Sequence, residues 1–446
     1  ATYSYKGRYT VNGTARYEGT NRMGKSRSAR WLPTWNVSGA WNAHEEKFFS
    51  NLTSVLSHFT LKASYSLTAD RGPADVTNSQ AIITSYSPYR PFTSIQESGL
   101  YIKELENSEL TYEKKHELNI GADMGFLNNR INLAVDWYKR NNYDLIGIVN
   151  TQGAGGQILK YANIASMKSH GIEFTLSTKN IKTKDFNWNT DFIFSNAKNE
   201  VTDLKQNANV MELISGNGFA KQGYPVRGLF SIPFVGLDKD GIPVIINEKG
   251  EATSTDINFQ ERQNTGFLKY EGPTDPTITG SLGNMFSYKG FRLNLFITYS
   301  FGNVIRLNPV FKAYYSDLTA MTREFKNRWT LPGDEAKTNV PAILSKRMYD
   351  SNEDLKYAYN AYNYSTERIA KGDFIRLKEI SLAYDFPKAW INPLKLTDLS
   401  LKVQATNLFL IYADDKLNGQ DPEFFNAGGV ASPVPRQFTI TLRLGL

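Results

Sequence analysis

The 446-residue sequence contains no cysteine, only four histidines and no long apolar run. Without cysteine it can form neither disulfides nor thiolate metal sites. No histidine stands at a metal-ligand spacing such as HExxH, and no GxSxG nucleophile motif occurs. No stretch approaches the roughly 18 consecutive apolar residues that a membrane-spanning helix requires. These absences argue against an enzyme, a metal centre and a resident cofactor, although scattered Ser and Asp residues leave a hydrolase formally open.

Charge of one sign is also not concentrated anywhere in the chain. The 51 Lys and Arg residues outnumber the 44 Asp and Glu residues, which gives a formal net charge of +7. Because these charges are dispersed and form no basic block, they predict a solvated surface and no nucleic-acid partner. The mean hydropathy of −0.42 is typical of soluble proteins. It is equally typical of membrane-spanning strands, in which every second residue is polar.

The clearest positive signal is the last stretch, Gln437 to Leu446, which alternates strictly between apolar and polar residues. Period-2 alternation predicts a β-strand with one apolar and one polar face. The residues predicted to face lipid are Phe438, Ile440, Leu442, Leu444 and Leu446.

Similar patterns recur along the whole chain and predict about 13 strands. Most run for 10–13 residues, which matches the roughly 9–11 residues of a tilted bilayer-spanning strand better than the roughly 5–6 of a globular strand. The predicted strands are Ala1–Tyr5, Arg8–Glu18, Trp31–Trp41, Phe59–Thr68, Lys115–Phe126, Ile131–Asn141, Met167–Ser177, Phe186–Ala197, Ile278–Tyr288, Phe291–Phe301, Phe374–Phe386, Leu396–Leu408 and Gln437–Leu446.

The connections between these strands alternate between short turns, such as Lys6-Gly7 and Lys289-Gly290, and long loops, such as 200–277 and 302–373. Short periplasmic turns and long extracellular loops characterise outer-membrane barrels. The predicted fold is therefore all-β: a transmembrane antiparallel up-and-down β-barrel.

An odd number of strands places the start of the first strand and the end of the last strand on opposite sides of the membrane. Bacterial barrels have an even number of strands, and an open sheet edge in lipid is costly. We therefore expect residues 1–446 to be the C-terminal segment of a larger barrel, with a plug domain and the first barrel strands lying outside this sequence.

Two sets of side chains are candidates for function. Aromatic residues in the long loops could stack on sugars or peptide side chains, although packing between loops is the more ordinary role. These substrate-loop candidates are Tyr86, Tyr89, Tyr314, Tyr315, Trp329, Tyr359, Tyr362, Tyr364, Phe424 and Phe425. Polar residues on the predicted lumen face would form a hydrated wall, or would only stabilise the barrel and contact a plug. They are Lys62, Asp123, Asp136, Arg140, Asp191, Arg292, Lys402 and Arg443.

Several longer motifs resemble those of SusC-like TonB-dependent outer-membrane transporters. Gly372–Pro387, GDFIRLKEISLAYDFP, is similar to a conserved strand of that family, and Arg328–Asp334 is similar to its RWT-x-PGD loop. Further similar segments, in chain order, are Asn107–Leu145, Gly171–Leu204, Asn407-Leu408-Phe409 and Gln420-Asp421-Pro422-Glu423.

The resemblance implies a 22-stranded barrel in the bacterial outer membrane, of which this chain would form roughly strands 10 to 22. It also implies a plug, a TonB partner that drives import with the proton-motive force, and a SusD-like surface lipoprotein that acts as a lid. The cargo would be oligosaccharides or peptides, and a dimer of such complexes is possible. A passive porin or structural barrel is the first alternative function, and an outer-membrane hydrolase is the second.

Overall fold

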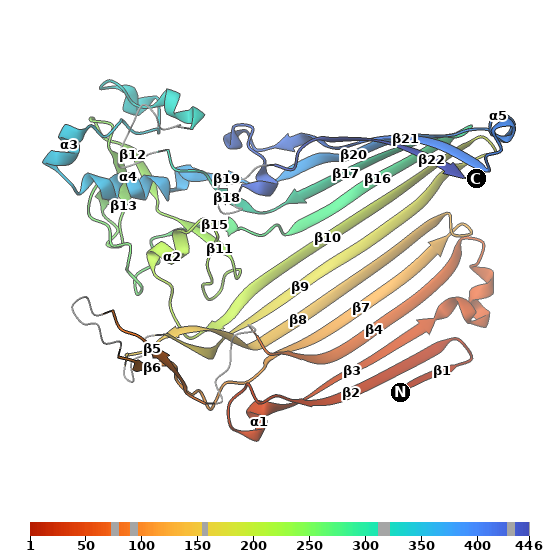
Figure 1. Cartoon of the computed structure of the whole chain (residues 1–446), viewed down its shortest axis with the longest axis horizontal. Coiled ribbons are helices and arrows are strands. Elements are labelled where there is room, and N and C mark those ends of the chain that lie inside the picture. The colour runs from red at the N-terminus through yellow and green to blue at the C-terminus, as the bar shows by residue number, and fades with distance from the viewer. Residues whose placement is uncertain (73–79, 90–96, 154–158, 311–321, 426–432, 446) are drawn as a thin grey trace. The chain divides into compact units, whose positions relative to one another are not determined.

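The computed structural model describes the chain except residues 73–79, 90–96, 154–158, 311–321, 426–432 and 446. Its main element is one antiparallel sheet of 13 strands in sequence order (Figure 1). All 13 predicted strands are present in the predicted order. In sheet order they are β1 (Thr2–Tyr5), β2 (Tyr9–Gly19), β3 (Trp31–Asn42), β4 (Leu56–Asp70), β7 (Glu113–Phe126), β8 (Ile131–Asn150), β9 (Leu159–Lys182), β10 (Phe186–Leu204), β16 (Ile278–Tyr288), β17 (Phe291–Phe301), β20 (Phe374–Asp385), β21 (Asp398–Ala413) and β22 (Gln437–Gly445).

The chain divides into two compact units. The first unit consists of Ala1–Asn129, Leu133–Ile172 and Lys198–Gln206. The second consists of Arg130–Asn132, Glu173–Ala197 and Asn207–Leu446. The division passes through β9 and β10, so each unit carries part of the sheet together with the loops attached to it.

Strand register collects the apolar side chains on one face of the sheet. In the second unit, Leu442 pairs with Leu401, which pairs with Tyr384, then with Phe291 and finally with Tyr288, across five strands. Leu442 is 59% exposed in the protein alone. This row of exposed apolar side chains is the lipid-facing surface that the alternation predicted.

The strand register of the first unit also places apolar and polar side chains on opposite faces. Tyr65 on β4 pairs with Val37 on one side and with Leu118 on the other. Lys62, on the opposite face, pairs with Ala40 and Gly121. Apolar and polar side chains therefore lie on opposite faces of the sheet in both units, as the alternation predicted, and the lumen-facing role of the polar residues stays a prediction.

The short turns depend on residues in left-handed backbone conformations. Lys6 and Gly7 between β1 and β2 have φ angles of 51° and 69°, and Lys289 and Gly290 between β16 and β17 have 44° and 90°. Two consecutive positive φ angles match the twist of a β-hairpin, and glycine adopts them without a Cβ clash. These hairpins confirm the predicted short turns.

Three strands extend well beyond their predicted limits. β8, β9 and β10 contain 20, 24 and 19 residues, whereas the alternation predicted about 11 or 12 in each. The predicted limits were wrong because the apolar alternation ends where the bilayer ends, whereas the backbone hydrogen bonds between strands continue beyond it.

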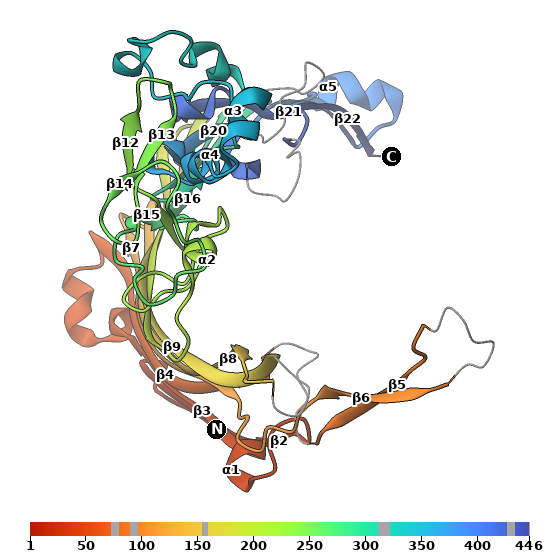
Figure 2. The ribbon, with the colours of Figure 1, turned by 90° about the vertical axis from the view of Figure 1, so that its left-hand side faces the viewer.

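The long loops also contain regular structure that the sequence pattern did not predict. In the first unit, β5 (Ile82–Tyr86) and β6 (Gly99–Glu104) form a hairpin that extends away from β2 and β3 (Figure 2). A short helix, α1 (Arg27–Arg30), precedes β3. The hairpin lies within the long connection between β4 and β7.

The loops of the second unit fold into a layer at the end of β16 and β17 opposite to α5 (Lys388–Ile391) (Figure 1). In the segment Asp238-Lys239-Asp240-Gly241, the Asp238 side chain accepts hydrogen bonds from the backbone of Asp240 and Ile242, both at 2.9 Å, so this segment is a turn. The elements of this layer are α2 (Val210–Ile214), β11 (Gly228–Ser231), β12 (Phe234–Leu237), β13 (Pro243–Ile246), β14 (Ala252–Thr253), β15 (Lys269–Pro273), β18 (Val304–Arg306), α3 (Lys346–Ser351), α4 (Leu355–Asn363) and β19 (Ile369–Lys371).

The largest buried apolar cluster lies in this loop layer. It includes Val210, Leu213, Phe230, Ile232 and Ile245. Such burial provides the hydrophobic stabilisation that orders a loop in water. Among the described residues, no helix is long and apolar enough to cross a membrane.

Candidate functional site

A polar cavity of about 740 Å³ lies among the long loops of the second unit. Its lining comes from Leu307 and from three stretches that are far apart in the sequence, around residues 324–340, 362–368 and 415–418. Four acidic and four basic residues contribute to the lining: Glu324, Asp334, Glu367, Asp415, Arg328, Lys337, Arg368 and Lys416.

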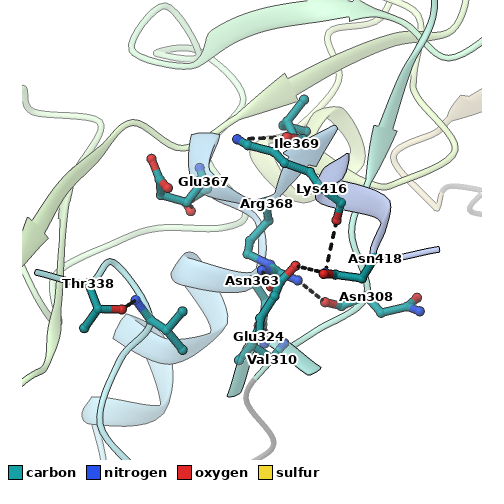
Figure 3. Close-up of polar contacts among 12 residues, drawn as sticks. Asn308, Val310, Glu324, Thr338, Asn363, Glu367, Arg368, Ile369, Lys416 and Asn418 are labelled. Carbon is teal, nitrogen blue, oxygen red and sulfur yellow. Dashed lines mark hydrogen bonds and ion pairs between the residues drawn. The ribbon is translucent and has the colours of Figure 1, made fainter. Parts of the chain in front are cut away.

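Arg368 is the central charged residue of this cavity (Figure 3). It is only 3% exposed, and it ends a short 3-10 helix that directly precedes β19. Its guanidinium forms an ion pair with Glu324 and donates a hydrogen bond of 2.6 Å to the carbonyl oxygen of Asn308. A buried guanidinium requires such partners, since an unpaired charge in the interior is very costly.

The same contacts join further loops to the cavity wall (Figure 3). The side-chain amide of Asn418 donates to Glu324 at 2.9 Å, and Lys416 donates to the carbonyl oxygen of Ile369 at 3.4 Å. Glu324 therefore accepts hydrogen bonds from Arg368 in its own long loop and from Asn418 in the loop between β21 and β22. We define Glu324, Arg368 and Asn418 as the loop triad.

Asp334 organises the RWT-x-PGD segment at another wall of the cavity. Its carboxylate accepts hydrogen bonds from the backbone of Leu331 and the hydroxyl of Thr330, both at 3.0 Å, and pairs with Lys337 at 3.2 Å. These contacts, led by the backbone of Leu331, lower the pKa of Asp334 to about 2. The carboxylate is therefore ionised at physiological pH.

Trp329, one of the aromatic candidates, lies in the same segment. Its indole N–H donates to Glu335 at 3.0 Å, and this hydrogen bond is the largest cause that lowers the pKa of Glu335. Its ring packs so closely on Gly241 that a Cβ atom there would lie 2.5 Å from it. Trp329 thus has a packing role in the structure, and contact with a ligand remains a prediction.

The candidate tyrosines of α4 lie inside the loop layer. Tyr359 is fully buried and its hydroxyl donates to the carbonyl oxygen of Ala342 at 3.0 Å, and burial raises its pKa. Tyr362 is 1% exposed and lines the cavity, and burial raises its pKa to about 12. The ring of Tyr364, the next candidate, lies over the guanidinium of Arg306 at 5.8 Å. Burial favours the packing role for Tyr359 and leaves Tyr362 at the cavity wall.

The remaining aromatic candidates are dispersed. Tyr86 and Tyr89 belong to the first unit, where Tyr89 is 90% exposed. Tyr314 and Tyr315 lie outside the described residues. Phe425 packs against the cluster that contains Ile305 and Leu307, and Phe424 precedes it in a short 3-10 helix (Pro422–Phe424).

The predicted lumen-facing residues form mostly local ion pairs. Lys62 pairs with Asp123 at 2.7 Å, and Arg292 pairs with Asp385 at 2.7 Å. Further contacts along this face are Arg140 to Glu117 at 3.1 Å, Lys402 to Glu379 at 3.8 Å, and the hydroxyl of Ser177 to Asp191 at 2.6 Å. Asp136 lines a smaller cavity together with Lys62, and Arg443 on β22 pairs through its backbone with Ser400. Charged and hydrogen-bonded side chains of this kind would line a hydrated lumen wall.

A second charged contact links the strand wall to the last long loop. Arg376 on β20 is 5% exposed and contacts Asp421 at 2.5 Å and Glu423 at 3.2 Å. The cavity beside it, of about 710 Å³, is also lined by Phe425 and Asn308. Arg376 thus holds the loop between β21 and β22 against the lumen face of the sheet.

Sequence reasoning missed the loop triad and Arg376, because it selected aromatic residues in the loops. The only available signal was that Arg376 and Asp421 lie in two motifs of the same family resemblance. Within the described part of the chain, no group of three or more histidine, cysteine, aspartate or glutamate residues is placed to hold a metal ion. The cavities offer hydrogen-bond donors and acceptors that suit a polar ligand.

The family model described as "TonB dependent receptor-like, beta-barrel" matches residues 1–408. The chain belongs to this family of outer-membrane proteins. The 13-stranded antiparallel sheet is thus part of a TonB-dependent receptor barrel fold, and its location is the bacterial outer membrane, as the sequence predicted.

Curated relatives agree with this assignment. TonB-dependent receptor P3 of Formosa agariphila is 25% identical over 94% of this chain and 41% of its own length. TonB-dependent receptor SusC of Bacteroides thetaiotaomicron is 26% identical over 100% of this chain and 42% of its own length. The chain is therefore SusC-like, and it spans less than half the length of these relatives.

Solved structures share the fold. A structure of the RagAB peptide transporter covers 99% of this chain with a TM-score of 0.77 at 24% identity, and matches 46% of that chain. The RagAB importer in its "open-open" state gives a TM-score of 0.78 at 23% identity, over 100% of this chain and 46% of that chain.

Proposed function

We propose that the chain forms the C-terminal part of the barrel of an active importer, which takes oligosaccharides or peptides across the outer membrane in a SusCD-type complex. The observation that carries the proposal is the charged, ordered cavity in the extracellular loops of a SusC-like chain. A SusD-like surface lipoprotein is the proposed lid. A plug and TonB, which act through the part of the importer outside this sequence, are the proposed gate and energy source.

The cavity chemistry suits capture of a polar cargo. Exposed amide and charged side chains of the cavity lining, such as Asn339 and Lys337, can replace the water that hydrates hydroxyl or peptide groups. The ion-paired lumen face would then give the released cargo a hydrated path. No step of this mechanism requires a covalent intermediate.

Uptake measurements test the proposal. Deletion of the gene for this chain should abolish uptake of the labelled oligosaccharide or peptide that the importer carries, and an uncoupler of the proton-motive force should do the same. Uptake that continues in the presence of the uncoupler would contradict the active importer and favour a passive porin.

A second measurement addresses the partners. Purification of the native complex followed by mass spectrometry should identify a surface lipoprotein and a plug-bearing segment together with this chain. Their absence would contradict the SusCD-type assembly. Turnover of a lipid or peptide by the complex, lost on mutation of one loop serine, would favour the hydrolase instead.

A further inference from the structure

The lipid-facing row of β7 changes from apolar to basic at its extracellular end. Leu118 on this row pairs with Tyr65, His116 pairs with Leu67, and Lys114 pairs with Ala69. The lipid-facing residues nearer the periplasm are Ile120, Ala122, Met124 and Phe126. The apolar row thus ends at Leu118, and two basic side chains follow it.

The neighbouring strands β8 and β9 change in the same way. On β8, Trp137 is followed on the same face by the exposed Lys139. On β9, Ile172 is followed toward the extracellular end by His170 and Lys168, both exposed. Alternation along each strand places these residues on the lipid face, since successive side chains point to opposite faces.

β10 extends the pattern to a fourth strand. Glu200 pairs with Lys168 at 3.0 Å and therefore shares its face, and Lys198 lies two residues before it and is exposed. We call Lys114, His116, Lys139, Lys168, His170 and Lys198 the basic band. All six residues belong to the first unit.

The height of the band corresponds to the outer headgroup region. From Phe126 to Leu118, a strand with a rise of about 3.4 Å per residue and a tilt of about 45° climbs roughly 19 Å. The apolar belt of an outer-membrane barrel is about 25 Å tall. The next lipid-facing residues, His116 and Lys114, therefore emerge where the lipid chains end and the headgroups begin.

His116 has a buried polar atom that no group among the described residues satisfies. Its ring lies between those of Tyr65 and Tyr143, with centroid distances of 5.7 Å to each. Its Nδ1 atom is buried without a hydrogen-bond partner in the described part of the chain. Lys114 lies beside it, 2.6 Å from Asp144 and over the ring of Tyr143 at 5.9 Å.

We propose that the basic band binds the phosphate groups of phosphorylated lipids in the outer leaflet of the membrane. The net charge of the band favours an anionic ligand, because ion pairs among the described residues engage only two of its four lysines, Lys114 with Asp144 and Lys168 with Glu200. The aromatic side chains on the neighbouring strands, including the Trp35 and Tyr65 pair at 5.4 Å, supply flat surfaces for the sugar part of such lipids. This proposal is independent of the cargo of the importer.

The ordinary alternative is that these lysines only extend their amines into the interface, as long basic side chains do near membrane boundaries. Such snorkelling requires no phosphate. Dependence of binding on the phosphate group therefore separates the two explanations.

The test uses the native complex that contains this chain, purified in a neutral detergent and titrated with lipopolysaccharide or with enzymatically dephosphorylated lipopolysaccharide. Binding is followed by tryptophan fluorescence and native mass spectrometry. We expect the phosphorylated form to bind at least tenfold more tightly. Loss of each lysine should weaken binding about fivefold, so K139Q/K168Q/K198Q should weaken it roughly 100-fold.

The matched control is K179Q/K182Q/K184Q, which removes three exposed lysines from the periplasmic end of the β9–β10 hairpin. This variant should bind lipopolysaccharide within twofold of the wild type. Equal binding of the two lipid forms by the wild type would overturn the proposal, even if K139Q/K168Q/K198Q failed to fold. Unchanged binding by that variant would also overturn it.

Discussion

The guanidinium of Arg376 lies 2.5 Å from the carboxylate of Asp421, 45 residues further along the chain. Arg376 belongs to the wall strand β20, and Asp421 belongs to the loop between β21 and β22. Because both side chains are nearly buried, this contact determines where the loop lies against the lumen face.

We therefore expect Asp421→Asn to loosen the last long loop. The loss of one charge-assisted hydrogen bond should lower the local free energy of opening by about 1.5–3 kcal/mol. The loop should stay partly anchored, because Glu423 still contacts Arg376 at 3.2 Å. Hydrogen exchange of peptides that cover residues 415–425 measures this change. Asp415→Asn is the control, and equal exchange in the two variants would contradict the role of Arg376.

The loop triad should behave as a coupled unit. Arg368→Met leaves Glu324 without its buried cation and should destabilise the loop layer by about 3–5 kcal/mol. Glu324→Gln in the same chain should recover part of this loss, because no uncompensated carboxylate remains. Thermal unfolding of the two single variants and the double variant forms a double-mutant cycle. Strict additivity would show that the ion pair contributes nothing specific.

The stability of the RWT-x-PGD segment should fall in acid. The pKa of Asp334 is about 2 in the folded chain, compared with 3.8 for the unperturbed group. A lowered pKa stabilises the fold above about pH 4, and this contribution is lost as the pH falls toward 2. The melting temperature should therefore fall less between pH 5 and pH 2 in Asp334→Asn than in the wild type. An equal fall in both proteins would refute this assignment.

Gly241→Ala should be more disruptive than Gly250→Ala. Both glycines have positive φ angles, 73° and 81°, so each substitution costs roughly 1–2 kcal/mol of backbone strain. Only at position 241 does the new Cβ meet the ring of Trp329, whereas position 250 has nothing within 4 Å. A larger drop in the melting temperature of G241A measures the contact. Equal drops would mean that Trp329 moves away freely.

The two faces of β22 should tolerate arginine differently. Leu442→Arg places a charge on the lipid face and should cost roughly 2–4 kcal/mol if it lies near mid-bilayer. Thr441→Arg, on the lumen face next to Lys402 in register, should cost much less. Folding from detergent into lipid vesicles compares the two variants, and equal folding would contradict the assigned faces.

Sequence reasoning succeeded for the sheet because its signal is local. The alternation from Phe438 to Leu444 assigns the faces of β22 without any knowledge of its neighbours. The positive φ angles at Lys6-Gly7 and Lys289-Gly290 follow from turn chemistry at the same short range. The limits of β9 were wrong because backbone pairing outside the bilayer leaves no apolar pattern.

The sequence alone determined the number, order and alternating faces of the 13 strands, because each strand has its own local apolar–polar alternation and the strands pair in chain order. Only the tertiary structure decided that Arg368 meets Glu324 and that Arg376 meets Asp421, because loop closure joins side chains across more than 40 residues. It also decided that Tyr359 is buried within the loop layer, since the burial of an aromatic ring depends on segments that pack over it from elsewhere in the chain.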